Sequence, residues 1–269
     1  MKIIVQKFGG TSVASEEARV AVKNKVQQAI RNGYSPVVVV SAMGRKGAPY
    51  ATDTLIGALK DVNLSVNVRE MDMMMCCGEI ISACVMAATL QKFGINAMAL
   101  TGGQAGIITD SQFGAARIKN INTSGLIRLL EAGIIPVVCG FQGMTENNYK
   151  FTTLGRGGSD TSAAALGAAL KADFVEIYTD VEGIMTADPR LVKGANILEQ
   201  ISRKLDPNHP AERMSIDVAK AKIEQYAAES KVLRALAHFD LVRIYGKPYT
   251  EDQGASLGVP LVTGVLESN

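Results

Sequence analysis

The 269-residue sequence predicts an α/β fold, a three-layer α/β/α sandwich whose central sheet is mostly parallel. Three observations support this fold class. Short apolar runs alternate along the chain with stretches of helical periodicity, as in a sheet covered by helices. The run Pro36 to Val40 is apolar throughout, as expected of a parallel strand buried on both faces. Most predicted strands end at Gly, Ser, Thr or a charged residue, which places polar groups along one edge of the sheet.

The elements can be assigned in order. Lys2 to Phe8 is rich in β-branched residues and predicts a first strand that ends at Gly9-Gly10. A helix follows, because Ser15 precedes two glutamates as a helix start does, and Gly33 ends it. The later predicted strands are Pro36 to Val40, Ile95 to Leu100, Ile134 to Cys139 and Asp173 to Tyr178, with a small hairpin joining Gly106 to Asp110 with the region around Ile118. The later predicted helices are Thr52 to Leu59 (capped by Thr52 and Asp53), Ser65 to Phe93, Ser124 to Ala132 (capped by Ser124) and Thr161 to Lys171.

The composition limits the partners. A hydrophobic content of 47% is enough for the core of one large domain or two small ones. The net charge of +2 and the absence of Trp argue against nucleic acid and membrane surfaces as partners. We expect no membrane span, because no apolar run is recognised as long enough for one, and no signal peptide is recognised at the N-terminus.

The cysteines predict no metal site. Cys76, Cys77, Cys84 and Cys139 include no CxxC pair, and neither histidine is near them in sequence. A zinc site is therefore not expected. We expect reduced, mostly buried thiols, and hence a cytoplasmic protein.

The segment Phe151 to Asp160, FTTLGRGGSD, predicts an anion-binding turn before a helix. Its glycines let backbone amides approach an anion, and the helix start adds the positive end of a dipole. Arg156 is placed to pair with a carboxylate or phosphate through its planar fork, and Asp160 to act as a helix cap or polar organiser. The alternative is an ordinary turn with a solvated arginine.

Two further charged residues are candidates. Lys7 stands at the end of the first strand, beside a Gly-Gly-Thr-Ser loop, where a phosphate would bind in an open α/β sheet. Its alternative is a solvated charge. Glu79 lies among apolar residues and needs a partner if buried, so it could receive a substrate ammonium or else face water. The polar stretch Gly44 to Ala51 could be a mobile active-site loop.

Four sequence motifs, taken together, give the chain a resemblance to a known family. Lys7 to Val13 (KFGGTSV), Gly78-Glu79, the Phe151 to Asp160 segment and Thr179 to Arg190 (TDVEGIMTADPR) resemble the aspartate kinases of the amino acid kinase superfamily. The resemblance covers roughly residues 1–201, is weak over 202–239 and partly returns over 240–257.

The resemblance implies one catalytic domain over residues 1–269, with an amino-acid-binding N-terminal part, a nucleotide-binding part from about residue 150 and no ACT regulatory domain. The implied reaction is ATP-dependent phosphorylation of the β-carboxylate of L-aspartate to 4-phospho-L-aspartate, without built-in feedback regulation. A carboxylate is already ionised near neutral pH, so no general base is needed. Mg²⁺ is expected mainly on ATP oxygens, since it usually keeps few protein ligands, and a homo-oligomer is expected.

The resemblance also implies residue roles. Lys7 would bridge the phosphates as a catalytic residue, and Asp160 would hold Lys7 in place. The implied substrate-binding residues are Thr52, Glu79 for the α-ammonium, Arg156 for the α-carboxylate, Gly157 and Ser159. The implied nucleotide-binding residues are Lys7, Gly9, Gly10, Ser41, Thr179, Asp180, Met185, Arg190 and Lys220.

Two departures and two alternatives stay open. Met185 stands where the family usually has Tyr, and the family's Gly-Ala-Lys-Val-Leu-His-Pro motif is absent, which makes Lys220 its nearest lysine and Lys222 the second choice. The alternatives are a kinase for another amino acid or small carboxylate of the superfamily, and a non-catalytic subunit that partners a full-length aspartate kinase. A dehydrogenase is disfavoured because no GxGxxG follows the first strand.

Overall fold

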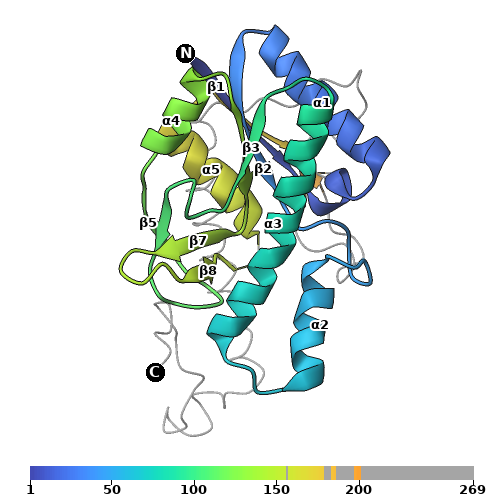
Figure 1. Cartoon of the computed structure of the whole chain (residues 1–269), viewed down its shortest axis with the longest axis vertical. Helices are drawn as coiled ribbons and strands as arrows, with labels where there is room; N and C mark the ends of the chain where they lie inside the picture. Colours follow the sequence, from blue (N-terminus) through green and yellow to red (C-terminus); the bar gives the residue numbers. More distant parts are fainter. Residues whose placement is uncertain (156, 179–182, 186–196, 201–269) are drawn as a thin grey trace, which may run out of the picture. The chain divides into compact units, whose positions relative to one another are not determined.

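The centre of the fold is a five-stranded sheet in which every neighbouring pair of strands is parallel (Figure 1). The computed structural model describes residues 1–155, 157–178, 183–185 and 197–200. The strand order is β3-β6-β2-β1-β9. The strands are β1 (Lys2–Phe8), β2 (Tyr34–Val40), β3 (Ala97–Leu100), β6 (Ile135–Cys139) and β9 (Phe174–Tyr178). The predicted mostly parallel sheet is confirmed.

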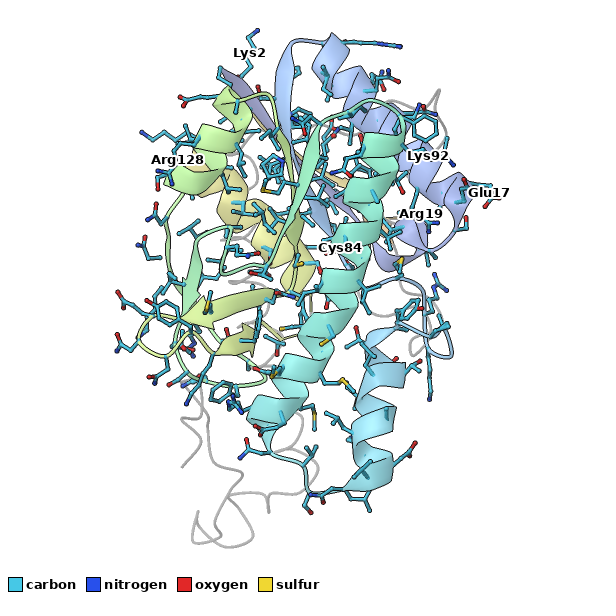
Figure 2. All side chains as sticks on the ribbon, viewed as in Figure 1. Lys2, Glu17, Arg19, Cys84, Lys92 and Arg128 are labelled. Atoms are coloured by element: carbon cyan, nitrogen blue, oxygen red, sulfur yellow. The ribbon has the colours of Figure 1, made fainter. Side chains whose placement is uncertain are left out.

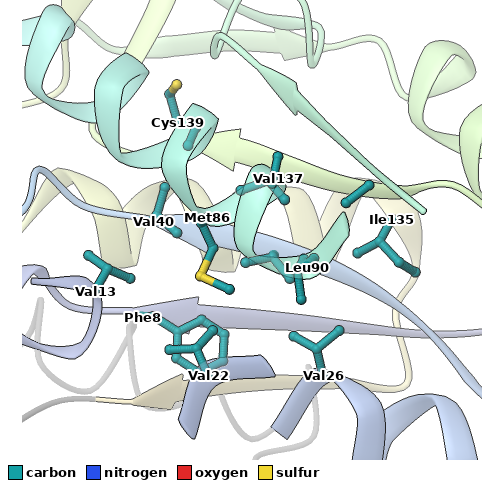
Figure 3. Close-up of a cluster of buried hydrophobic side chains, with 14 of the residues drawn as sticks. Phe8, Val13, Val22, Val26, Val40, Met86, Leu90, Ile135, Val137 and Cys139 are labelled. Carbon is teal, nitrogen blue, oxygen red and sulfur yellow. The ribbon is translucent and has the colours of Figure 1, made fainter. Parts of the chain in front are cut away.

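Helices cover both faces of this sheet because successive strand residues point to opposite sides. On β2, Val38 and Val40 pack into one apolar cluster, whereas Val37 and Val39 pack into the other. Figure 3 shows the first cluster, where Phe8 of β1 lies against side chains of two helices. The helices on this face are α1 (Glu16–Arg31) and α3 (Val68–Lys92), and those on the other face are α4 (Ser124–Glu131) and α5 (Gly158–Leu170). The three layers are therefore confirmed.

Helix α3 corrects one expectation from the sequence. It has 25 residues and is long and apolar enough, by length and composition, to cross a membrane. Half of its most apolar window is nevertheless buried inside the described fold. Met86 and Leu90 of this helix pack against the sheet in the first cluster. Packing in the core of an α/β domain accounts for the apolar composition of α3.

A second, four-stranded sheet with the order β5-β4-β7-β8 lies beside the first (Figure 1). Its strands are β4 (Ile107–Thr109), β5 (Ile118–Ile121), β7 (Gln142–Thr145) and β8 (Phe151–Thr153). The antiparallel pairing of β4 with β5 confirms the predicted hairpin. Strands β7 and β8 were not predicted, because each has only three or four residues, mostly Gln, Gly and Thr, and no apolar run. A further antiparallel pair joins β10 (Gly183–Met185) and β11 (Ile197–Gln200).

Helix starts follow the sequence signals only in part. Ser15 caps α1, since its Oγ accepts a hydrogen bond from the Ala18 amide at 3.2 Å. Helix α2 (Thr52–Val62) has Ala51 at its N-cap, without a side-chain cap bond, so the predicted capping by Thr52 and Asp53 is wrong. Ser124 is likewise the first residue of α4 rather than its cap. The Gly-Gly-Thr-Ser loop contains a short 3₁₀ helix, Gly10–Val13.

The cysteine prediction holds for two thiols. Cys76 and Cys139 are buried, and burial raises the pKa of both thiols. Cys84 is exposed on α3, and Figure 2 labels it among the side chains of that helix. All four cysteines are free.

Candidate functional site

A cavity of about 350 Å³ lies where the parallel strands end. Lys7 enters it from the end of β1, Ser41 follows β2 and Phe141 follows β6. The site thus occupies the carboxyl edge of the sheet, as predicted from the polar strand ends. The remaining lining residues are Gly10, Ala42, Gly44, Thr52, Glu79, Gly155, Gly157, Gly158, Ser159 and Asp160.

The cationic part of the cavity is an ion pair. The Lys7 Nζ lies 2.7 Å from Asp160 Oδ1, with side-chain exposures of 9% and 50%. Lys7 is held by the backbone of β1, which pairs on both sides within the sheet, so only its side chain has freedom. Asp160 lies in the first turn of α5 and limits that freedom further. The ammonium is thereby fixed at the cavity, where it can neutralise an anion.

Glu79 supplies a carboxyl group of which only one oxygen has a hydrogen-bond partner among the described residues. Its side chain is buried on α3, with the residue only 3% exposed. Oε1 accepts a hydrogen bond from the Ala42 amide at 3.1 Å, whereas Oε2 has no hydrogen-bond partner among the described residues. Desolvation raises the pKa of Glu79 to about 8, against the lowering effect of the Ala42 amide. A buried carboxylate with an unpartnered oxygen beside a cavity is a ready acceptor for a ligand cation.

The anion-binding turn is built from glycines and the start of α5. Gly157 is the N-cap of α5 and has a φ of +73°, a left-handed conformation that favours glycine. The helix begins at Gly158 rather than at Thr161, so its first turn, including Ser159, lines the cavity. The positive end of the helix dipole therefore faces the cavity and favours an anion there.

The loop after β1 comes very close to the loop after β2. A Cβ on Gly10 would lie 2.4 Å from the carbonyl oxygen of Ala42, so only glycine fits at this approach. Gly10 also accepts a hydrogen bond from the Gly44 amide at 3.0 Å. The Gly9 amide donates to the Tyr178 carbonyl at 3.2 Å, which ties this loop to the end of β9 as well. The two loops thus form one wall beside Lys7.

The structure brings most of the predicted site residues together. Those that line the cavity are Lys7, Gly10, Ser41, Thr52, Glu79, Gly157, Ser159 and Asp160. Gly9 adjoins the cavity, since a Cβ there would lie 3.9 Å from Lys7 Nζ. Met185 ends β10. The predicted residues Arg156, Thr179, Asp180, Arg190 and Lys220 lie outside the described residues.

Two lining residues, Ala42 and Phe141, were given no role from the sequence, whereas Gly44 lies in the predicted mobile loop and Gly155 and Gly158 lie in the predicted anion-binding turn. Phe141 could have been found, because it follows the predicted strand that ends at Cys139. It has a φ of +67°, which is unusual for a residue with a side chain. Its amide donates to Ser162 Oγ at 3.0 Å and its carbonyl accepts from the Leu154 amide at 2.8 Å. Residues held by their surroundings in such an unusual backbone conformation cluster at active sites.

Comparison with known proteins agrees with this geometry. The model of the amino acid kinase family matches residues 2–236. Aspartokinase 1 of Bacillus subtilis (strain 168) is 51% identical over 202 residues, which are 75% of this chain and 50% of that protein. The aspartokinase of Geobacillus stearothermophilus is 50% identical over 202 residues, 75% of this chain and 48% of that protein. This chain thus spans about half the length of the curated relatives it matches.

Solved structures of aspartate kinases are also similar to this chain. Aspartate kinase from Synechocystis matches with a TM-score of 0.56 and 46% identity, over 72% of this chain and 31% of that one. Aspartokinase III of E. coli, in complex with aspartate and ADP in its R-state, matches with a TM-score of 0.59 and 27% identity, over 74% of this chain and 54% of that one. The family model covers most of the sequence and the fold has the same architecture, so the chain belongs to the amino acid kinase family.

Proposed function

We propose that this chain transfers the γ-phosphoryl group of ATP to the β-carboxylate of L-aspartate, forming 4-phospho-L-aspartate and ADP. The observation that carries the proposal is the unpartnered Oε2 of buried Glu79, which lines the same cavity as Lys7 and Ser159. An α-ammonium would give that oxygen its missing partner. The curated relatives at 50% and 51% identity are aspartokinases, and the E. coli relative holds aspartate and ADP.

The reaction needs charge neutralisation rather than a general base. A carboxylate oxygen of the acceptor attacks the γ-phosphorus, the bond from that phosphorus to the β–γ bridging oxygen breaks, and ADP leaves with the electron pair. No proton has to be removed, since the acceptor is already ionised. Lys7, held by Asp160, neutralises charge on the transferring group, and the α5 N-terminus favours a bound anion beside it.

The other residues of the site take roles around these two charges. We assign Thr52, Arg156, Gly157 and Ser159 with Glu79 to the amino acid, and Gly9, Gly10, Ser41, Thr179, Asp180, Met185, Arg190 and Lys220 with Lys7 to the nucleotide. The division at about residue 150 into an amino-acid-binding part and a nucleotide-binding part stays a prediction, because this assignment places residues for each substrate on both sides of it.

Magnesium would come with ATP. The described residues contain no group of three or more His, Cys, Asp or Glu side chains that could hold a metal ion. Mg²⁺ commonly keeps water and phosphate oxygens as ligands, so a site with few protein carboxylates fits it. The ion supplies neutralisation of phosphate charge when bound. Four free thiols fit a reducing cytoplasm, and the expected homo-oligomer stays a prediction.

The decisive experiment is an acceptor panel. The purified chain is incubated with Mg-ATP and L-aspartate, L-glutamate or succinate, and acyl phosphate is trapped with hydroxylamine as the hydroxamate. Succinate is aspartate without the α-ammonium, so it tests the role of Glu79 directly. We expect hydroxamate and ADP in equal amounts with aspartate and far less of both with succinate.

The same panel separates the alternatives. A better acceptor than aspartate would mean a kinase for another substrate of the family. Binding of aspartate and ATP without turnover would mean a non-catalytic subunit.

A further inference from the structure

A second buried carboxylate lies on α3, two helical turns before Glu79. Asp72 is 0% exposed and does not line the cavity. Glu79 is seven positions further along the helix, which places the two acids on the same face of it. The proposed reaction gives Asp72 no role, yet a buried carboxylate is costly unless it is fully hydrogen-bonded.

Asp72 is hydrogen-bonded by three donors from two segments. Its Oδ2 accepts from the amides of Gly114 and Thr153, both at 2.9 Å. Its Oδ1 accepts from the hydroxyl of Thr153 at 2.8 Å. The Thr153 carbonyl in turn accepts from the Ala116 amide at 2.8 Å. Asp72 therefore joins the end of β8 and the loop before β5 to α3.

The segment held in this way leads directly into the anion-binding turn. Thr153 is the last residue of β8, and Gly155, which lines the cavity, follows two residues later. A Cβ on Gly155 would lie 3.7 Å from the carbonyl oxygen of Gly114, so the turn rests on the same loop. One helix thus carries Glu79 at the cavity and, at Asp72, the anchor for the start of the opposing turn.

We propose that Asp72 is a positioning residue that sets the place of residues 154–155 and 157–158 relative to Glu79, and thereby holds the groups that bind the α-ammonium and the α-carboxylate of the amino acid in register. This inference rests on the proposed function, in which Glu79 takes the α-ammonium and the turn takes the α-carboxylate. Asp72 acts through backbone amides and touches neither substrate.

The test uses variants that change these bonds by small steps. Asp72→Ala removes all three acceptor contacts, and Thr153→Val removes one hydroxyl at nearly constant volume. Asp72→Asn is the rescue variant, because its amide oxygen can accept both backbone bonds while its NH₂ donates to the Thr153 hydroxyl. Thr109→Val is the matched control. Thr109 is 2% exposed in the same sheet, and its hydroxyl bonds Thr152 Oγ1 at 2.6 Å and the Asp110 carbonyl at 3.0 Å, so this variant removes a buried hydroxyl of the same sheet that does not bond Asp72.

We expect Asp72→Ala to raise the KM for aspartate roughly tenfold or more, and Thr153→Val by a smaller factor, with the KM for ATP changed less than about twofold. Asp72→Asn should return the KM for aspartate close to the wild-type value. Thr109→Val should lower the thermal midpoint of unfolding but leave the KM for aspartate unchanged. Equal rises in both KM values, or the same rise in Thr109→Val, would overturn the proposal. Should Asp72→Ala not fold, Thr153→Val decides alone.

Amide hydrogen exchange supplies a readout that needs no substrate. If Asp72 positions the turn, Thr153→Val accelerates exchange over residues 153–160 more than Thr109→Val does. Equal exchange there would overturn the inference. A wild-type chain that does not phosphorylate aspartate refutes the proposed function instead, and exchange still decides whether Asp72 positions the turn.

Discussion

Two carboxylates line the same cavity in opposite electrostatic states. Asp160 is half exposed and already paired with Lys7 at 2.7 Å, whereas Glu79 is buried and has one oxygen without a described partner. An acid that already has a cation beside it can hold that cation in place for another ligand. An unsatisfied buried acid gains a partner when a cationic ligand arrives. The difference supports the proposal that Asp160 arranges the lysine for phosphate binding and that Glu79 recognises the substrate amine.

The strongest test of this comparison is Lys7→Ala. Removing the cation that Asp160 holds should lower kcat by about 10²–10³, the usual cost of losing one charge-stabilising donor. The KM for aspartate should change much less, because Glu79 is untouched. Steady-state ADP release measures both values. Lys2→Ala, an exposed lysine on the same strand, is the control and should behave as the wild type. Near-normal turnover in Lys7→Ala would remove Lys7 from the mechanism.

The next largest effect is expected from Glu79→Gln. The amide can still accept from Ala42 but carries no charge for an ammonium, so kcat/KM for aspartate should fall roughly 10- to 100-fold, the worth of a charge-assisted hydrogen bond. The weak reaction with succinate should not fall. The partly exposed Glu70 on the same helix provides the control Glu70→Gln. An equal loss with succinate would show that Glu79 acts on something other than the amine.

A smaller effect is expected from Asp160→Asn. Lys7 keeps its charge and its place on β1, and the carboxylate that it loses is half exposed and partly screened by solvent, so kcat should fall by about tenfold or less. The KM for aspartate should stay close to the wild-type value, which contrasts with Glu79→Gln. Initial rates at saturating aspartate and varied ATP give the comparison. A loss as large as that of Lys7→Ala would mean that Asp160 itself contacts the reacting groups.

The sequence predicted the half of the site that lies on regular strand ends. Lys7 and Ser41 follow apolar runs long enough to be recognised as strands, and parallel strands must end at a common edge. The burial of Glu79 was left open, because the apolar stretch around it suits both a buried and an exposed helix face. Only the packing of α3 against the sheet decides between them.

The parts that escaped prediction depend on contacts distant in sequence. Strands β7 and β8 have too few residues to show a periodic pattern, and they exist because they pair with β4 and with each other. The positive φ of Phe141 is held by Ser162 and Leu154, each more than ten residues away. Likewise, the sequence around Asp72 predicts no role for it, because its partner Thr153 is distant in sequence and comes within hydrogen-bond distance only in the folded chain.

The smallest expected effect is the pH dependence of stability that Glu79 contributes. Its pKa is about 8 in the fold and near 4.5 for an ordinary glutamate. Between these values the folded chain keeps a proton that the unfolded chain has released, so the free energy of unfolding falls as pH rises through this window. The favourable contribution is fully present below about pH 4.5 and is lost as pH rises through about 8.

Urea unfolding of wild type and Glu79→Gln between pH 6 and 9 measures this contribution. The difference in unfolding free energy between the two proteins should shift in favour of the variant as pH rises toward about 8 and level off above it, because glutamine does not titrate. Saturating aspartate should remove part of the shift, since its ammonium stabilises the ionised carboxylate. A difference that is constant with pH would mean that Glu79 is ionised in the free protein and that its open oxygen is solvated.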